Sequence, residues 1–291
     1  MNKFEIFTDS SCDLTDGIIT KYNINVVSLT FMVQNEEYNC YSKGNVGDVK
    51  MFYDLLRKKE NLTTSCVNSD TFITAFTKTL IEGYDILYIG FSSGLSGTYA
   101  AAELAASKLR SKFPKQKILC VDSRGGCLGE GLLVLYAAIQ REKGKTLAEA
   151  YKWQMDNLLM ISHLFTVDDL FFIFRGGRLN RAKYMIGNLI NIKPILYADE
   201  TGVIMQQRKV IGRKKSILTL ADLLVQTIDK SEEQIVAIAH ADCLEDAMLL
   251  KDKIGDKIKV KEWIINYIDP VMGTHGGPGT LAVFFKSATS R

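Results

Sequence analysis

Apolar residues in the first half of the chain come in short runs, each followed by small polar residues and then an amphipathic stretch. The runs KFEIFT, YDILYIG and QKILCVD lead into DSSCDLTDGIITKY, FSSGLSGTYAAAELAASKLRSKF and SRGGCLGEGLLVLYAAIQREKG. A succession of strand, small-residue turn and helix is typical of a parallel α/β sheet. Residues 25–45 differ, because they predict two strands around the polar turn Gln34-Asn35-Glu36.

The pattern changes after residue 157. HLFTV predicts a short strand, DDLFFIFRGGRLN a helical turn, and residues 192–216 a hairpin that turns at Asp199-Glu200-Thr201-Gly202. The runs EQIVAIAH, KVKEWIINY and TLAVFF, with the helix CLEDAMLLKDKIG, complete a mixed sheet. We therefore predict an α/β protein with an N-terminal domain over residues 1–157 and a C-terminal domain over residues 158–291.

Composition and charge narrow the class of protein. The 291 residues, 47% of them apolar, suffice for two domains with substantial cores. The 36 basic and 33 acidic side chains nearly cancel, so net charge gives no reason to expect nucleic-acid binding. Six cysteines without a C-x-x-C pair predict neither disulfides nor a zinc site. The apolar stretch near the start of the chain is too short for a signal peptide, and no run of 18 apolar residues follows it. We therefore expect a cytoplasmic protein.

Two hydroxyl-rich segments stand where helices are expected to begin. Ser96-Gly97-Thr98 follow a predicted strand, and Thr63-Thr64-Ser65 precede the predicted helix SDTFITAFTKTLIEG. Free N–H groups and hydroxyls at such places suit an anion, although the same residues also serve as ordinary helix caps, as Asn68 or Ser69 can here. In a parallel sheet these loops gather at one edge, where ligands bind. Neither a Walker A loop nor a nucleophile elbow is matched.

A histidine, His275, lies in the glycine-rich segment GTHGGPGT, which predicts a tight loop. The glycines let the backbone pass close to a ligand, and the imidazole then supplies a switchable donor; the alternative is a turn histidine bonded to backbone. We expect His163 and His240 to be structural or interfacial, and the glycines of VDSRGGCLGEG to form a tight packing turn.

The order of motifs TDSSCDL, TTS, SSGLSGTY, VDS, FRGGRL, IKPIL, VIGRKKS, IAHAD and GTHGGPGTL resembles the DegV family, whose bacterial members include the FakB fatty-acid-binding proteins. The resemblance covers nearly the whole chain. It implies a two-domain α/β fold that buries one long-chain fatty acid between its domains. It also implies a carrier rather than an enzyme, with no cofactor, which presents the carboxylate to a partner fatty acid kinase for acyl-phosphate formation in phospholipid synthesis.

The resemblance also implies the carboxylate contacts. They are Thr64, a serine among Ser92, Ser93 and Ser96, of which we favour Ser96, and His275, with Ser65, Gly94 and Thr274 beside them. The sequence departs from the family pattern after Ser65, where Cys66-Val67-Asn68 stand in place of Gln-Pro-Ser. A carboxylate entering an apolar tunnel must regain hydrogen bonds, which two hydroxyls and an imidazole provide.

Basic residues cluster in two further segments. The segment RGGRLNRAK contains four basic residues: Arg175, Arg178, Arg181 and Lys183. The segment QQRKVIGRKKS contains five: Arg208, Lys209, Arg213, Lys214 and Lys215. Such clusters are commonly just solvated, but they also suit docking of the kinase, of ATP phosphates or of an anionic membrane surface. On the docking hypothesis, Arg178→Glu with Arg213→Glu leaves fatty-acid binding intact and weakens kinase-dependent turnover.

Two other classes of function remain open from the sequence. One is a subunit of the dihydroxyacetone-kinase type that holds a small ketone through a histidine, which requires a small polar pocket. The other is a serine hydrolase that uses Ser96 or Ser93 with His275 and an acid such as Asp122, which requires the base within hydrogen-bond reach of the nucleophile.

Overall fold

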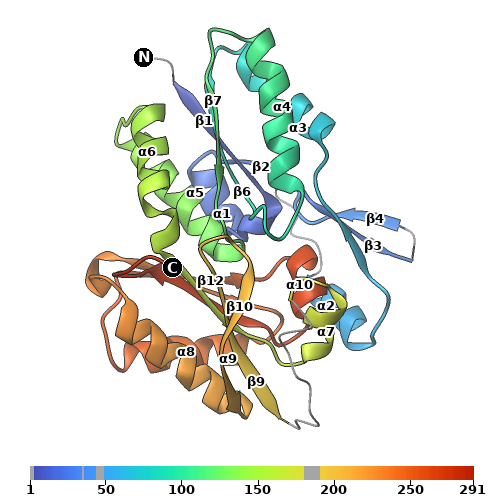
Figure 1. Cartoon of the computed structure of the whole chain (residues 1–291), viewed down its shortest axis with the longest axis vertical. Coiled ribbons are helices and arrows are strands. Elements are labelled where there is room, and N and C mark those ends of the chain that lie inside the picture. The colour runs from blue at the N-terminus through green and yellow to red at the C-terminus, as the bar shows by residue number, and fades with distance from the viewer. Residues whose placement is uncertain (1–2, 35, 44–48, 180–190) are drawn as a thin grey trace.

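The computed structural model describes residues 3–34, 36–43, 49–179 and 191–291, and its first sheet lies in the upper part of Figure 1. In spatial order its strands are β2 (Asn25–Val27), β1 (Phe4–Asp9), β6 (Asp85–Gly90) and β7 (Ile118–Asp122). All three pairings are parallel. β6 is buried along its whole length, as expected for a strand covered by helices on both faces. The predicted N-terminal parallel sheet is therefore confirmed.

The second sheet, in the lower part of Figure 1, is mixed. In spatial order its strands are β10 (Ile204–Ile211), β9 (Ile192–Ala198), β8 (Ile161–Thr166), β13 (Leu281–Lys286), β11 (Ile235–His240) and β12 (Glu262–Tyr267). Only the pair β11 and β12 is parallel among the described pairings of this sheet. The predicted hairpin turn is confirmed, since the Asp199 N–H donates to the Val203 carbonyl.

A small antiparallel sheet lies to the right in Figure 1, in the order β4 (Glu36–Asn39), β3 (Thr30–Val33) and β5 (Thr63–Ser65). The hairpin predicted within residues 25–45 corresponds to β3 and β4, with Asn35 of its turn outside the described residues. One detail of the prediction is wrong, because residues 25–27 join the parallel sheet. Thr63–Ser65 precede the helix α3 as predicted, but they also form a strand that the sequence analysis did not predict.

Helices cover both faces of the parallel sheet and the outer face of the mixed sheet. They are α1 (Asp16–Lys21), α2 (Val49–Arg57), α3 (Ser69–Ile81), α4 (Thr98–Lys112), α5 (Cys127–Glu142), α6 (Leu147–Asn157), α7 (Leu170–Arg175), α8 (Arg213–Thr227), α9 (Leu244–Gly255) and α10 (Pro270–Gly276), with short 3₁₀ turns η1 (Ser10–Cys12), η2 (Leu158–Met160) and η4 (Ser231–Glu233). Asn68 caps α3 as predicted. In the described ranges, no helix has the length and apolar character needed to cross a bilayer.

The mixed sheet has two apolar faces because side chains alternate along each strand. Leu164, Val283 and Phe285 pack under α8 and α9, whereas Ile161 and Phe284 point the other way, into a core that includes α5. That core also contains residues of β1 and β6, so α5 lies between the two sheets and joins them. A domain boundary between residues 157 and 158, where α6 gives way to η2, stays our proposal.

Candidate functional site

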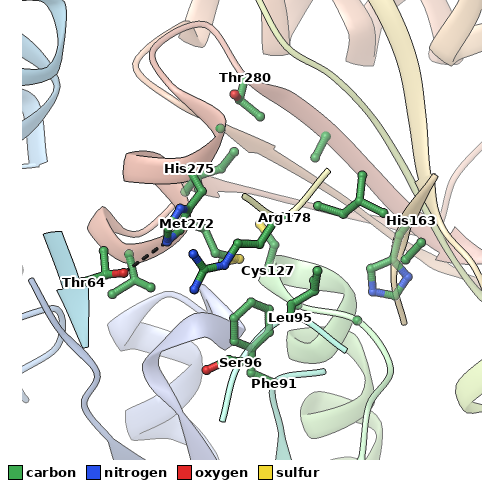
Figure 2. A pocket seen from close by; sticks show the side chains of 18 of the residues that line it. Thr64, Phe91, Leu95, Ser96, Cys127, His163, Arg178, Met272, His275 and Thr280 are labelled. Carbon is green, nitrogen blue, oxygen red and sulfur yellow. Dashed lines mark hydrogen bonds between the residues drawn. The ribbon is translucent and has the colours of Figure 1, made fainter. Parts of the chain in front are cut away.

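A cavity of about 300 Å³ lies between the two sheets, and its wall combines residues that are far apart in the sequence. Phe91 comes from the loop after β6, Phe165 from β8 and Phe284 from β13. Most of the wall is apolar, but it also includes the polar side chains of Thr64, Ser65, Ser96, His163, Arg178, His275 and Thr280. In Figure 2, Thr64 and His275 lie together with Arg178 next to them, Ser96 lies below, and His163 lies on the side opposite Thr64. We call the end with Thr64, His275, Arg178 and Ser96 the polar end, and the end with His163 the apolar end.

Thr64 and His275 form the centre of the polar end. The Thr64 Oγ1 and His275 Nε2 atoms are 3.1 Å apart, a hydrogen bond drawn as a dashed line in Figure 2. If Nε2 carries the proton and donates to Thr64, the Thr64 hydroxyl hydrogen is free to donate to an anion in the cavity. The pair can thus act as a relay that offers a hydrogen-bond donor without a fixed positive charge.

Two short elements bring this pair together. Thr64 is the central residue of β5, with the partly buried side chain, while Thr63 and Ser65 on either side are exposed. His275 lies in α10, which begins at the N-cap Asp269, whose side chain accepts the Met272 N–H at 2.8 Å. The predicted loop is therefore wrong. An N-cap aspartate followed by Pro270 is a helix-start signal in the sequence, and it overrides the glycines that follow.

Of the glycines after His275, Gly276 lines the cavity, whereas Gly277 and Gly279 have a different role from the one predicted. Gly277 has φ +81°, and a Cβ there would lie 2.3 Å from the Phe172 ring. A Cβ on Gly279 would lie 2.7 Å from the Cβ of Asp168. These glycines let the chain leaving α10 pass close to α7 and the segment before it, not close to a ligand.

His275 is uncharged near neutral pH. Burial, with smaller contributions from the charges of Arg178 and Arg175, lowers the pKa of His275 to about 4. Its Nδ1 atom has no hydrogen-bond partner among the described residues and faces the backbone of Gly176. A neighbouring carboxylate favours the charged imidazole, so a bound anion is expected to raise the pKa of His275 again.

Ser96 contributes a further hydroxyl to the polar end. Its Oγ accepts the Thr98 N–H at 3.2 Å and lies 2.9 Å from Thr98 Oγ1. When Thr98 is the donor in that second contact, the Ser96 hydroxyl hydrogen is free for a ligand. Ser96 therefore contacts the first residue of α4 and also lines the cavity, but the N-cap of α4 is Gly97, which makes no side-chain cap hydrogen bond.

The structure separates the other predicted carboxylate contacts. Ser65 lines the cavity, but Ser92, Ser93, Gly94 and Thr274 are not part of its wall. The buried Ser92 hydroxyl donates to the Gly202 carbonyl at 2.9 Å, and the exposed Ser93 hydroxyl donates to Asp122 at 2.5 Å. Thr274 donates to the Pro270 carbonyl within α10. These four residues therefore lie outside the cavity wall.

Ser92 and Ser93 instead fix the loop after β6 in place. The contact of Ser92 with Gly202 ties this loop to the turn of the β9–β10 hairpin. Asp122 accepts hydrogen bonds from both the backbone and the hydroxyl of Ser93. This loop carries Phe91 and Ser96 into the cavity wall, so the two serines act on the site indirectly.

The predicted basic residues differ in whether they line the cavity. Arg178, predicted as a docking residue, is exposed and lines the cavity beside His275. The Arg175 guanidinium lies over the ring of Phe171, with a centroid distance of 5.4 Å. Arg213 pairs with Asp246 at 2.8 Å and is not part of the cavity wall. Arg181 and Lys183 lie outside the described residues.

His163 and the glycines at the start of α5 and just before it were not predicted to lie at the site. A Cβ on Gly125 or Gly129 would lie 2.0 or 2.1 Å from His163 Nε2, so the imidazole occupies a notch that only glycine leaves open. A Cβ on Gly126 would similarly meet Phe91 at 2.5 Å. The prediction of a tight packing turn is thus confirmed. Nothing in the sequence showed that the packing partner is a cavity residue.

Comparisons with known proteins agree with this architecture. The family model described as "Uncharacterised protein, DegV family" matches residues 3–288. The chain belongs to the DegV family. A DegV domain-containing protein of Clostridium perfringens is 43% identical over 289 residues, covering 99% of both chains.

Solved structures of DegV proteins have the same fold. A DegV lipid-binding protein from Thermotoga maritima superposes with a TM-score of 0.86 at 26% identity, covering 99% of this chain and all of that one. DegV from Bacillus subtilis, a fatty-acid-binding protein, gives a TM-score of 0.84 at 27% identity, covering 98% of this chain and 99% of that one. The family resemblance inferred from the motifs is therefore confirmed.

Proposed function

We propose that this DegV-family protein binds one long-chain fatty acid, with the tail in the cavity and the carboxylate at Thr64, His275 and Ser96. The observation that carries this proposal is the division of one cavity into an apolar interior and a polar, partly exposed end. The fatty-acid and lipid binding of the two solved relatives supports it.

The two ends of such a ligand match the two ends of the cavity energetically. Each buried methylene contributes about 0.8 kcal/mol, so a long tail supplies most of the affinity. The carboxylate loses hydration as it enters, and the hydroxyls of Thr64 and Ser96 with His275 replace the lost hydrogen bonds. Arg178, exposed at the same end, adds a cation whose attraction is screened by water and salt.

A small-ketone site and a serine hydrolase fit this geometry less well. A small polar ligand leaves an apolar wall that includes Phe91, Phe165 and Phe284 without a function. A hydrolase needs a histidine bonded to its serine, but Ser93 bonds Asp122 directly and Ser96 bonds Thr98. His275 bonds Thr64 instead. We therefore infer a carrier and not an enzyme.

The first experiment is native mass spectrometry of the freshly purified protein, followed by organic extraction. We expect one long-chain fatty acid per chain. An empty protein that also fails to take up added palmitate or oleate would contradict the proposal, and the small-ketone function would then be tested with dihydroxyacetone.

We further propose that a fatty acid kinase phosphorylates the carboxylate while it is bound. The head-group residues lie at the exposed end: Arg178 and Ser65 are both exposed there, so a partner can approach the carboxylate without unfolding the carrier. The start of α8, with exposed Lys214 and Lys215, offers a basic docking surface. Arg213 is a poorer probe of docking, because reversing its charge places it against Asp246.

The docking proposal is tested with Lys214→Glu/Lys215→Glu, and Lys108→Glu/Lys112→Glu on α4 serves as the matched charge control. With a purified fatty acid kinase and ATP, we expect slower acyl-phosphate formation for the α8 pair only, with unchanged fatty-acid affinity for both pairs. Equal turnover of the two variants rejects α8 as the docking surface.

A further inference from the structure

The apolar end of the cavity abuts a second, smaller cavity. This second space has a volume of about 140 Å³ and is bounded by β8, β9, the end of α8 and the segment after β13. His163 and Ala198 line both cavities. They therefore form the partition between the space proposed for the fatty-acid tail and the space beyond it.

His163 is held rigidly in that partition. Its side chain is buried with 4% exposure, and its Nδ1 atom lies 3.0 Å from the Ile161 carbonyl, which fixes Nδ1 as the donor. The ring packs edge-on against Phe284, with centroids 5.3 Å apart, and its far edge fills the notch at Gly125 and Gly129. These contacts hold the ring between the two cavities.

The partition is also compatible with an apolar tail. Burial, and to a lesser extent the charge of Arg291, lowers the pKa of His163 well below its usual range, so the ring is neutral. In Figure 2 the imidazole lies on the far side of the cavity from Thr64 and His275. A ligand whose carboxylate is held by that pair points its methyl end toward His163.

We propose that His163, with Ala198, is the end wall that limits the length of the acyl chain this protein accepts. This inference rests on the proposed fatty-acid binding, and it names the residues that limit the length of the bound acyl chain. Removing the imidazole opens space at this end of the cavity for a longer tail. The second space beyond it is lined by Leu164, Tyr197 and Leu223 together with polar residues, among them Ser162, Thr227 and Arg291. The length of the acyl chain is thus limited mainly by the buried side chain of His163, and not by the total volume of the apolar core.

The test is a series of saturated fatty acids of increasing length, with affinities measured by calorimetry for wild type, His163→Ala and His163→Gln. Affinity is expected to rise about fourfold with each added methylene until the tail reaches the wall, and to fall beyond it. In His163→Ala the rise continues past the wild-type limit, with a gain of about tenfold or more for the first acid beyond it. His163→Gln, which retains most of the bulk, keeps the wild-type limit.

Two further variants complete the test. Ile254→Ala in α9 removes buried volume from a core position that lines neither cavity, and should leave the length limit unchanged. Ala198→Leu thickens the wall from the other side and should move the limit to shorter acids, a result that does not depend on the folding of His163→Ala. A folded His163→Ala or Ala198→Leu with the wild-type limit overturns the inference. If wild type binds no acid of any length, the proposed function itself fails.

Discussion

Each end of the cavity contains a histidine, and the two histidines have different roles. His275 lies in the seven-residue helix α10 at the partly exposed end, where its Nε2 contacts a hydroxyl that can pass a hydrogen bond to a ligand. His163 lies in the middle of β8, where its Nδ1 is tied to a backbone carbonyl and its ring is enclosed by glycines. The comparison shows that the role of a histidine is not determined by its chemical type alone. It depends on the helix or strand that carries the side chain and on the residues that surround it.

The largest expected effect is at the polar end. Thr64→Val keeps the shape of the side chain but removes the hydroxyl, and should weaken fatty-acid binding by about 1.5–3 kcal/mol, the range for a hydrogen bond to a charged group. Calorimetry with palmitate measures the loss. The matched control is Thr63→Val on the exposed side of β5, and equal affinities of the two variants would place the head group elsewhere.

At the apolar end of the cavity we expect an effect of comparable size, but on the free energy of unfolding instead of on fatty-acid binding. Gly129→Ala forces a methyl group to within 2.1 Å of His163 Nε2 and should lower the free energy of unfolding by about 1–3 kcal/mol. The control is Gly17→Ala in α1, where nothing lies within 4 Å of the added Cβ and helix propensity predicts a small gain.

The cost of Gly129→Ala should largely disappear in the His163→Ala background, because the clashing ring is gone. Urea unfolding of the four combinations measures this coupling. Additive effects of the two substitutions would show that His163 does not depend on the glycine notch.

A comparable effect distinguishes the two histidines by pH. His275 has a folded-state pKa of about 4, below its ordinary value of 6.5, so its contribution to stability is complete above pH 6.5 and is lost as pH falls toward 4. Between these pH values, the Tm of the empty wild-type protein should fall several degrees more than that of His275→Gln, equivalent to about 3 kcal/mol.

Bound palmitate should reduce the acid sensitivity that depends on His275, because the carboxylate favours the charged imidazole. It should not reduce the part removed by His163→Gln, because burial also keeps the pKa of His163 low but no carboxylate reaches that end. Differential scanning fluorimetry of the empty and loaded proteins separates the two parts. Parallel Tm curves for all variants would contradict the comparison.

The smallest effect concerns the exposed arginine. Arg178→Gln should weaken palmitate binding by less than about 1 kcal/mol, and the difference should shrink at high salt, because the group is exposed. Arg213→Gln should leave the affinity unchanged, because Arg213 does not line the cavity. Equal effects of the two substitutions would indicate a general charge effect in place of a contact at the head group.

Much of this protein was determined by the sequence itself. Runs of buried β-prone residues followed by small residues and helical spacing specified the parallel sheet, and Asp199-Glu200-Thr201-Gly202 specified the hairpin, because these signals act over a few residues. The motif order identified the family. Thr64, Ser96 and His275 were chosen partly because hydroxyls and imidazole suit an anion, and they do line one cavity.

Other features were decided only by the tertiary structure. Sequence gave no reason to separate Ser96 from Ser92 and Ser93 beyond their distance from the helix start, and the separation depends on contacts with Gly202 and Asp122. Phe165, Phe284 and His163 look like ordinary core residues, since a cavity wall and a packed core use the same side chains. Whether such residues enclose space or fill it depends on what opposes them across the sheet, and those partners come from distant segments of the chain.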